Sequence, residues 1–336
     1  MKLLAELINT LGPSGYEDNV RALIKKEITP YVDEITTDKM GNLIARKRGK
    51  GQKIMLAAHM DEIGAMVKAI SERGFLNISR IGGIQPISLI GIRVDILRGN
   101  KKICKGVITF KELHDDIEMP EAIPKIEDIY VDVGLELEQL KKKVKIGDYV
   151  VPEANFDLLG DQNIISGKAL DDRIGCYILI ETAKRLKKSP LDIYFVFTVQ
   201  EEIGLYGAKT SVYDINPDFA IAIDTTIAKD GSIKEHKLGH GPFLTVKDSE
   251  LISNAQLNEH IKNIAKKNKI KLQLEVEDTG TTDATNIMLH KGGVPATVIS
   301  VGIRNIHSTI SVANYEDVKK SIELLLLVLK NPPKLR

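Results

Sequence analysis

The stretch Val199-Gln200-Glu201-Glu202-Ile203-Gly204 ends a run of β-branched and aromatic residues that begins at Leu191. The run from residue 191 to residue 199 predicts a buried strand. Two adjacent glutamates at the end of such a strand are costly unless a positive charge compensates them. Because consecutive side chains of extended backbone point to opposite sides, we expect one carboxylate to bind a cation while its neighbour faces elsewhere. We interpret Glu201 and Glu202 as the centre of a metal-dependent hydrolytic site.

Other side chains of the metal-ligand type stand at the ends of further predicted strands or at a helix start. They are His59, Asp61 and Glu62 after residues 53–58, Asp224 after residues 219–223, His307 after residues 294–301, and Asp171 and Asp172 at the start of an amphipathic helix. In open α/β sheets, ligands bind just beyond the carboxyl ends of the strands. We therefore expect these side chains to converge.

Histidines and carboxylates together form a mixed nitrogen and oxygen ligand set that suits Zn²⁺, Co²⁺ or Mn²⁺. Two such ions about 3.5–4 Å apart polarise a carbonyl group and hold a hydroxide nucleophile near neutral pH. Each residue also has an ordinary structural explanation, such as a helix cap for Asp171 or a salt-bridged pair for Glu201 and Glu202. The occurrence of several such residues at strand ends favours the metal site.

Helices and strands alternate before residue 64 and after residue 163, which predicts an α/β fold with a mostly parallel central sheet flanked by helices. Between residues 65 and 162 the pattern changes to short alternating segments separated by turn residues. These segments are Phe75–Arg80, Val94–Leu97, Lys105–Thr109, Ile129–Val133 and Tyr149–Val151. They predict a small all-β barrel or sandwich. Because candidate ligands precede and follow it, we interpret residues 65–162 as an insert in a discontinuous catalytic domain made of residues 1–64 and 163–336.

The composition gives no sign of a nucleic-acid or membrane partner. The net charge of the 336 residues is +1, and 28% of them are charged, so no overall field attracts a polyanion. The two cysteines cannot define a disulfide scaffold. The first residues lack a long apolar segment, and no uninterrupted apolar stretch approaches about 18 residues. We therefore expect a cytoplasmic protein.

The motifs taken together resemble the TET-type aminopeptidases, which are dinuclear metallopeptidases with a zinc-exopeptidase-like fold. Some members of this family carry the older label of endoglucanase or cellulase. The matching motifs are Gly12-Pro-Ser-Gly15, Ala58-His59-Met60-Asp61-Glu62, Ile81-Gly82-Gly83, Gly167-Lys-Ala-Leu-Asp171-Asp172-Arg173, Val199-Gln-Glu201-Glu202-Ile-Gly-Leu205, Asp224, Gly280-Thr-Thr-Asp283-Ala284 and Arg304-Asn-Ile-His307-Ser308. The resemblance covers essentially the whole chain. Tyr206 and Thr309 depart from the residues that relatives often carry at these two positions, which are Arg and Pro.

The resemblance implies a role for each candidate residue. It implies that His59 and Asp224 bind one metal ion, that Glu202 and His307 bind the other, that Asp171 bridges them, that Glu201 is the general base, and that Asp61 orients His59. It also implies two divalent ions per subunit, Zn²⁺ or Co²⁺, and an insert that drives assembly into a hollow tetrahedral homododecamer.

The resulting hypothesis is an aminopeptidase that hydrolyses N-terminal residues from short peptides with a water bridged by two metal ions. An amidase or deacylase of acylated amino acids is the nearest alternative, because the same metal pair would serve it. A glycosidase needs two carboxylates across a sugar bond and no metal. A non-catalytic peptide-binding shell protein is a further alternative, but Glu201 and the complete ligand set argue against it. The side chain accepted at the peptide N-terminus stays open.

Overall fold

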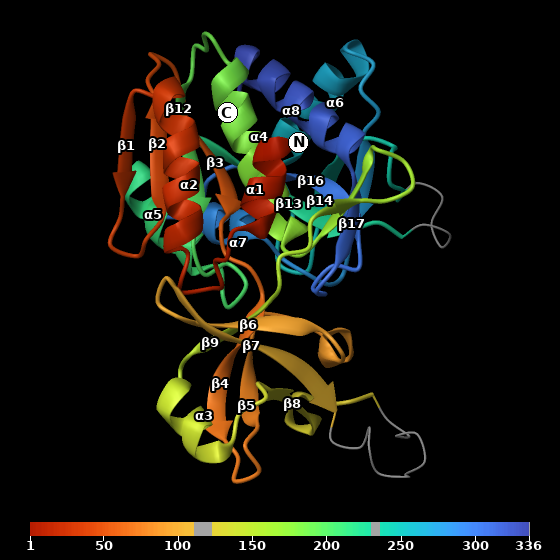
Figure 1. Cartoon of the computed structure of the whole chain (residues 1–336). Helices are drawn as coiled ribbons and strands as arrows, with labels where there is room; N and C mark the ends of the chain where they lie inside the picture. Colours follow the sequence, from red (N-terminus) through yellow and green to blue (C-terminus); the bar gives the residue numbers. More distant parts are fainter. Residues whose placement is uncertain (111–122, 230–235, 336) are drawn as a thin grey trace.

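The computed structural model describes residues 1–110, 123–229 and 236–335, which form a large mixed sheet with helices and a closed β-barrel (Figure 1). The large sheet runs in the spatial order β1 (Glu34–Thr37), β2 (Leu43–Lys47), β12 (Asp192–Thr198), β3 (Lys53–His59), β13 (Phe219–Ile227), β16 (Ala296–Arg304), β17 (Ser311–Asn314), β11 (Ile164–Gly167) and β10 (Asp157–Leu158). β14 (Phe243–Lys247) pairs with β16, and β15 (Gln273–Val276) pairs with β14.

The predicted α/β fold is confirmed, and the parallel pairing is found at the centre of the sheet. β12, β3, β13 and β16 are parallel neighbours. The strands outside them pair antiparallel, with the exception of β14 and β15. The carboxyl ends of the four central strands therefore meet at one edge of the sheet.

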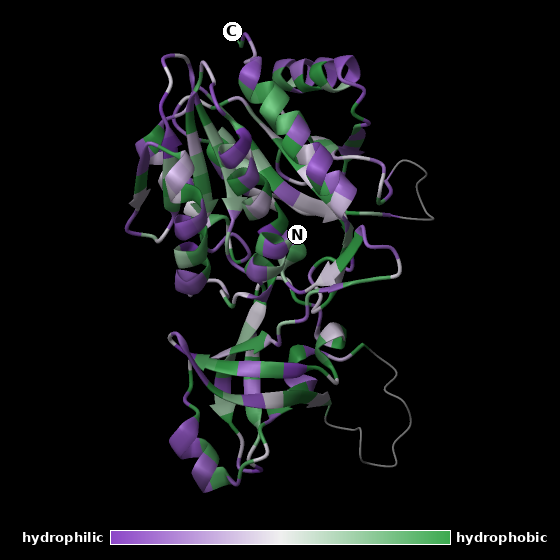
Figure 2. Cartoon of the chain, turned by 45° about the horizontal axis from the view of Figure 1, so that its top comes forward, coloured by the Kyte–Doolittle hydropathy of each residue, from purple (hydrophilic) through white to green (hydrophobic). Residues whose placement is uncertain are grey.

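Helices cover both faces of this sheet because its central strands are apolar on both sides. In β3, Ile54, Leu56 and Ala58 belong to one hydrophobic cluster and Met55 and Ala57 to another, as the alternation of a strand requires. The first cluster packs under α1 (Lys2–Asn9), α2 (Asp18–Ile28), α4 (Leu170–Arg185), α6 (Ala255–Lys267) and α8 (Tyr315–Lys330), and the second under α5 (Tyr206–Ile215) and α7 (Asp283–Met288). Figure 2 shows the apolar strands between these helices.

The barrel lies below the large sheet in Figure 1 and has a separate hydrophobic core. Its strands are, in spatial order, β4 (Gly64–Ile70), β5 (Leu76–Ile81), β8 (Ile129–Asp132), β7 (Lys101–Phe110), β6 (Arg93–Arg98) and β9 (Tyr149–Pro152). The expectation of a small β-barrel is thus confirmed. The barrel also contains α3 (Leu137–Lys143), and short 3₁₀ turns occur at Thr29–Tyr31, Pro86–Leu89 and Ile126–Asp128. The domain boundaries at 64/65 and 162/163 stay a prediction.

No helix of the described residues is long and apolar enough to cross a membrane.

A buried ion cluster fastens the chain where it leaves β3 for the barrel. The Glu62 side chain follows β3 and is 1% exposed, and its Oε2 lies 2.5 Å from Nζ of Lys168, which is equally buried. Arg173 of α4 lies 3.4 Å from Oε1 of Glu62 and donates to the carbonyl oxygens of Leu7 and Thr10. The cluster therefore joins the end of α1, the start of α4 and the entrance to the barrel.

We expect Lys168→Met to destabilise the protein strongly, because it leaves the buried carboxylate of Glu62 with one cation fewer. Removal of one partner of a buried ion pair costs about 3–5 kcal/mol. Urea denaturation followed by circular dichroism measures this change. Lys320→Met is the matched control, because Lys320 and Glu323 are both exposed and such a pair is worth about 0–1 kcal/mol. Equal denaturation midpoints for the two variants would contradict the structural importance of the cluster.

Candidate metal centre

The predicted ligands meet at the common carboxyl edge of the central strands. His59 ends β3 and pairs with Thr198, the last residue of β12, which precedes Glu201 and Glu202. The remaining candidates come from the next two strands and from α4. All of them line one cavity of about 610 Å³: His59, Asp171, Glu201, Glu202, Asp224 and His307. The structure thus brings these six candidates together around one cavity, and their roles as ligands or base stay predictions. Glu62, which was also expected to converge with them, does not line the cavity and pairs with Lys168 instead.

Asp171 lies between the two histidines of the cluster. Its Oδ1 is 3.2 Å from Nε2 of His59, and its Oδ2 is 3.5 Å from Nε2 of His307. Beyond them, Oε2 of Glu202 lies 3.6 Å from Nε2 of His307, and Oδ1 of Asp224 lies 4.0 Å from Nε2 of His59. The arrangement thus has two halves, each with one histidine and one outer carboxylate, and Asp171 is shared between them.

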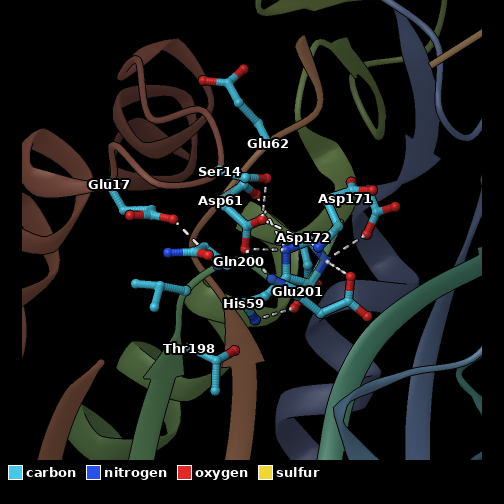
Figure 3. Close-up of polar contacts among 12 residues, drawn as sticks. Ser14, Glu17, His59, Asp61, Glu62, Asp171, Asp172, Thr198, Gln200 and Glu201 are labelled. Carbon is cyan, nitrogen blue, oxygen red and sulfur yellow. Dashed lines mark hydrogen bonds and ion pairs between the residues drawn. The ribbon is translucent and has the colours of Figure 1, made fainter. Parts of the chain in front are cut away.

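Asp61 lies beside His59 and Glu201 (Figure 3), and it is not among the residues that line the cavity. Its Oδ1 accepts a hydrogen bond of 3.0 Å from the Glu201 amide, and its Oδ2 accepts bonds from the Glu202 amide (3.2 Å) and the Ser14 hydroxyl (2.6 Å). Nδ1 of His59 lies 3.4 Å from Oδ1 and 3.2 Å from the Asp61 carbonyl oxygen. Asp61 therefore positions the imidazole and the backbone of both glutamates at once.

The cluster concentrates more negative charge than its histidines can balance. Burial, reinforced by the charge of Asp171, raises the pKa of Glu202 to about 8. Burial also raises the pKa of Glu201 and Asp224 well above the usual range. Burial opposes ionisation of Asp171 too, but hydrogen bonds from His307 and His59 hold its pKa below the usual range. The hydrogen bond to Asp171 raises the pKa of His307 to about 9. Such a site attracts additional positive charge.

The donor atoms fit divalent metal ions. His59, Asp171 and Glu202 offer ligand atoms that all lie within 4.8 Å of one another, and His59, Asp172 and Asp224 form a second group of this kind. Oε1 of Glu202 is buried and has no hydrogen-bond partner, so it is available as a ligand. A mixture of imidazole nitrogen and carboxylate oxygen suits Zn²⁺ and its neighbours in the transition series.

The two adjacent glutamates face the same cavity, which differs from the expectation for extended backbone. β12 ends at Thr198, and Gln200 has φ +53°, so the chain turns before the glutamates are reached. The turn continues through Gly204, whose φ is +155°. Non-glycine residues at positive φ are uncommon and cluster at functional sites. Here the turn brings Glu201 toward His59 and Glu202 toward His307.

Two further buried carboxylates lie beside the site, namely Asp172, which was among the side chains expected to converge, and Asp283, for which no role was predicted. Asp172 is fully buried, and its Oδ2 accepts a hydrogen bond from the His59 amide. Asp283 lies in the first turn of α7, and its Oδ2 accepts a hydrogen bond of 2.6 Å from the Thr198 hydroxyl. Both stand at a helix start, where an aspartate is commonly explained as a cap. Only their burial beside the cluster distinguishes them from caps.

The loop after β5 brings the barrel against the site through two glycines. A Cβ atom on Gly83 would lie 2.7 Å from Nδ1 of His307, and one on Gly82 would lie 3.1 Å from Oε2 of Glu202. Gly82 also has φ +75°. The amide of Gln85 donates to the His307 carbonyl oxygen. A side chain at Gly83 would therefore displace the His307 imidazole, which explains the need for glycine there.

An α/β sheet that gathers these donors at its carboxyl edge indicates a metal-dependent enzyme. The sequence comparison specifies the class further. A family profile described as M42 glutamyl aminopeptidase matches residues 41–324. A relative from Acetivibrio thermocellus is 41% identical over 96% of each chain. The lysyl aminopeptidase of Pyrococcus furiosus is 36% identical over 98% of this chain and 96% of its own length. The chain belongs to the M42 family and is a metallo-aminopeptidase.

Solved structures agree with this assignment. An aminopeptidase of the archaeon Desulfurococcus kamchatkensis superposes with a TM-score of 0.93 at 36% identity, covering 99% of this chain and 94% of the other. The TET1 peptidase of Pyrococcus horikoshii, which can assemble into a tetrahedron or a large octahedral shell, has a TM-score of 0.90 at 32% identity and covers 98% of this chain and 99% of its own. The resemblance to the TET-type aminopeptidases is thus confirmed.

Proposed function

We propose that this aminopeptidase holds two divalent ions, Zn²⁺ or Co²⁺, and removes N-terminal residues from short peptides. His59 and Asp224 would hold one ion, Glu202 and His307 the other, and Asp171 would bridge them. The observation that carries this proposal is the position of Asp171, whose two carboxylate oxygens face one histidine each. A carboxylate with this geometry is suited to share two ions.

Glu201 is the proposed general base. It lies in the cavity with Oε2 3.9 Å from Nε2 of His59, and burial raises its pKa well above the usual range. From this position Glu201 would take a proton from the attacking water and return it to the leaving amine. The two ions, when bound, supply an activated water and polarise the scissile carbonyl. Asp61 keeps His59 and the Glu201 amide in place.

The alternatives use the same observations less completely. An amidase of acylated amino acids would share the metal pair, and only its substrates would differ. A glycosidase would work without metal through two carboxylates, and the two histidines beside Asp171 would then have no function. A peptide-binding shell protein would not need Glu201. The family includes relatives named for lysyl and glutamyl residues, so membership alone does not decide which N-terminal side chain is accepted.

The decisive experiment is metal removal. We expect hydrolysis of aminoacyl p-nitroanilides to disappear after dialysis against a chelator and to return on addition of Zn²⁺ or Co²⁺, because the ligands alone cannot activate water at neutral pH. N-acetylated amino acids and a soluble β-glucan serve as substrates for the alternatives. Turnover of an acetylated substrate at a higher rate would favour the amidase. Activity that survives the chelator would contradict the metal mechanism.

The isosteric amide variants of the adjacent glutamates should fail differently. Glu201→Gln keeps the shape of the side chain and should leave metal binding intact, while turnover falls by about 10²–10⁴-fold because the proton carrier is lost. Glu202→Gln replaces an anionic ligand by a neutral one, so its defect should begin with metal affinity and be partly rescued by excess metal. Steady-state kinetics and metal analysis of the purified variants separate these effects.

The control is an amide variant of an acidic residue that is neither a proposed ligand nor the proposed base. Asp278→Asn is suitable because Asp278 is exposed and lies outside the cavity. If Glu201→Gln is rescued by metal, or Glu202→Gln retains full metal and loses only rate, the two roles are assigned the wrong way round.

Assembly into a homododecamer through the insert is the remaining part of the proposal. The insert exposes large apolar side chains, namely Ile87, Val107, Ile123 and Ile146, of which Ile146 is 71% exposed. Exposed apolar residues of this size suit subunit contacts. Light scattering should therefore report a closed particle of about twelve 37.2-kDa chains, and charged substitutions at the interface should break it down. A monomer with full activity would contradict this assembly.

A further inference from the structure

The cavity that holds the metal centre continues to a second group of carboxylates, which we call the acidic cluster. It consists of Asp248 after β14, Glu275 in β15 and Glu277 after β15, and all three line the cavity. β14 and β15 are paired in this region, with Thr245 opposite Glu275. None of the three residues is a proposed metal ligand or the proposed base, so the proposed mechanism does not explain why they line the cavity.

Asp248 has an oxygen that no group of the described chain satisfies. Its side chain is 7% exposed, and Oδ1 accepts hydrogen bonds from the amides of Glu250 (2.8 Å) and Leu251 (2.7 Å). Oδ2 is buried and has no partner. Burial of a carboxylate oxygen without a donor is costly. A donor brought into the cavity by a ligand would remove that cost.

Glu275 is equally buried and is held only by neutral groups. One of its oxygens accepts from the Thr226 hydroxyl and the other from the Thr245 hydroxyl at 2.9 Å. Its side chain is 5% exposed, and it forms no ion pair within the described residues. Burial raises the pKa of both Glu275 and Asp248, which is the direct cost of holding a carboxylate without a cation. Each oxygen of Glu275 can accept a further hydrogen bond.

The two lysines near the acidic cluster form ion pairs with carboxylates other than Asp248 and Glu275. Nζ of Lys229 lies 2.5 and 2.7 Å from the two oxygens of Glu277, and Nζ of Lys247 lies 3.0 Å from Oδ1 of Asp278. No lysine or arginine is among the described residues that line the cavity. Nδ1 of His236 likewise lies 3.7 Å from Oε1 of Glu277. Lys247 and His236 therefore act on Asp248 and Glu275 only from a distance, and neither of these two carboxylates forms an ion pair within the described residues.

A third metal ion is a poor candidate for this charge. In the described part of the chain, every group of three or more metal-type side chains with ligand atoms within 4.8 Å belongs to the metal centre. The acidic cluster is more widely spread, which suits an organic cation on a flexible stem. The ammonium group of lysine has three donors, and its methylene chain packs against apolar side chains such as Ile227, which lines the same cavity.

We propose that Asp248 and Glu275 form a subsite for a cationic side chain, so that the enzyme prefers peptides with N-terminal lysine or arginine. The inference rests on the proposed peptidase function, because it places the scissile bond at the metal centre and the side chain in the acidic cluster. An N-terminal glutamate would bring a further negative charge beside two carboxylates that form no ion pair within the described residues. The subsite therefore rejects acidic residues as well as attracting basic ones.

Lysyl and norleucyl p-nitroanilide form the sharpest test, because norleucine has the same unbranched chain without the ammonium group. We expect kcat/KM of the metal-loaded enzyme to be about tenfold or more higher for the lysyl substrate. The reason is that a hydrogen bond to a charged group is worth more than the free energy of a tenfold change, which is about 1.4 kcal/mol. Asp248→Asn and Glu275→Gln should each lower this preference by about tenfold, with norleucyl hydrolysis retained. Glu323→Gln is the matched control, because the exposed carboxylate of Glu323 pairs with Lys320 and lies outside the cavity. It should leave the preference unchanged.

Binding of lysinol and norleucinol measures the subsite without hydrolysis, since neither contains a scissile bond. Calorimetry should show tighter binding of lysinol to the wild-type protein and no difference for Asp248→Asn. Equal binding of the two alcohols, or faster hydrolysis of norleucyl or glutamyl than of lysyl substrate, would overturn the subsite and leave the peptidase intact. If no aminoacyl substrate is hydrolysed, the proposed function fails, and the binding comparison still decides whether the acidic cluster selects a cation.

Discussion

The buried carboxylate of Asp61 is the constraint on which the site depends. It accepts hydrogen bonds from the backbone amides of Glu201 and Glu202 and from the Ser14 hydroxyl, and it faces the ring of His59. A fully buried charge of this kind is tolerable only with several directed hydrogen bonds. Those bonds fix the end of β3 against the end of β12, and they hold the turn that carries both glutamates. The order of the metal centre is therefore a consequence of satisfying one buried anion.

The same short segment also sets the position of the barrel. Glu62 follows Asp61 and is paired with Lys168 and Arg173, and the first barrel strand, β4, begins at Gly64. The loop after β5 then returns to the site, where Gly82 and Gly83 approach Glu202 and His307. Two buried acids in succession thus connect the catalytic edge of the sheet with the insert. A displacement of the barrel would therefore move Gly83 relative to the His307 imidazole.

The sequence predicted the elements whose signal is local. The apolar runs before His59 and Asp224 formed the expected strands, and the absence of helical periodicity correctly indicated a barrel. The strand β4 was missed because Gly64–Ile70 follows the ligand loop without a turn signal and does not alternate. The direction of Glu201 and Glu202 depends on a turn whose positive φ at Gln200 is imposed by tertiary contacts. Asp172 was expected near the site from its place beside Asp171, whereas Asp283 resembles a helix cap in sequence, and only its burial in three dimensions reveals its place.

The two ends of the cavity are built from different parts of the sheet, and this separation has a physical consequence. The candidate ligands stand on or just after the central strands and on α4, and hydrogen bonds and close contacts through Asp61 and Asp171 connect them. The acidic cluster stands on β14 and β15, and β15 is a sheet edge that pairs with β14 alone. Because an edge strand has a paired strand on one side only, a substitution there contacts fewer surrounding residues. The contact between the two ends is the hydrogen bond from the Thr226 hydroxyl, two residues after Asp224 on β13, to Glu275. A change of charge on β15 would therefore reach the candidate ligands mainly through this one bond.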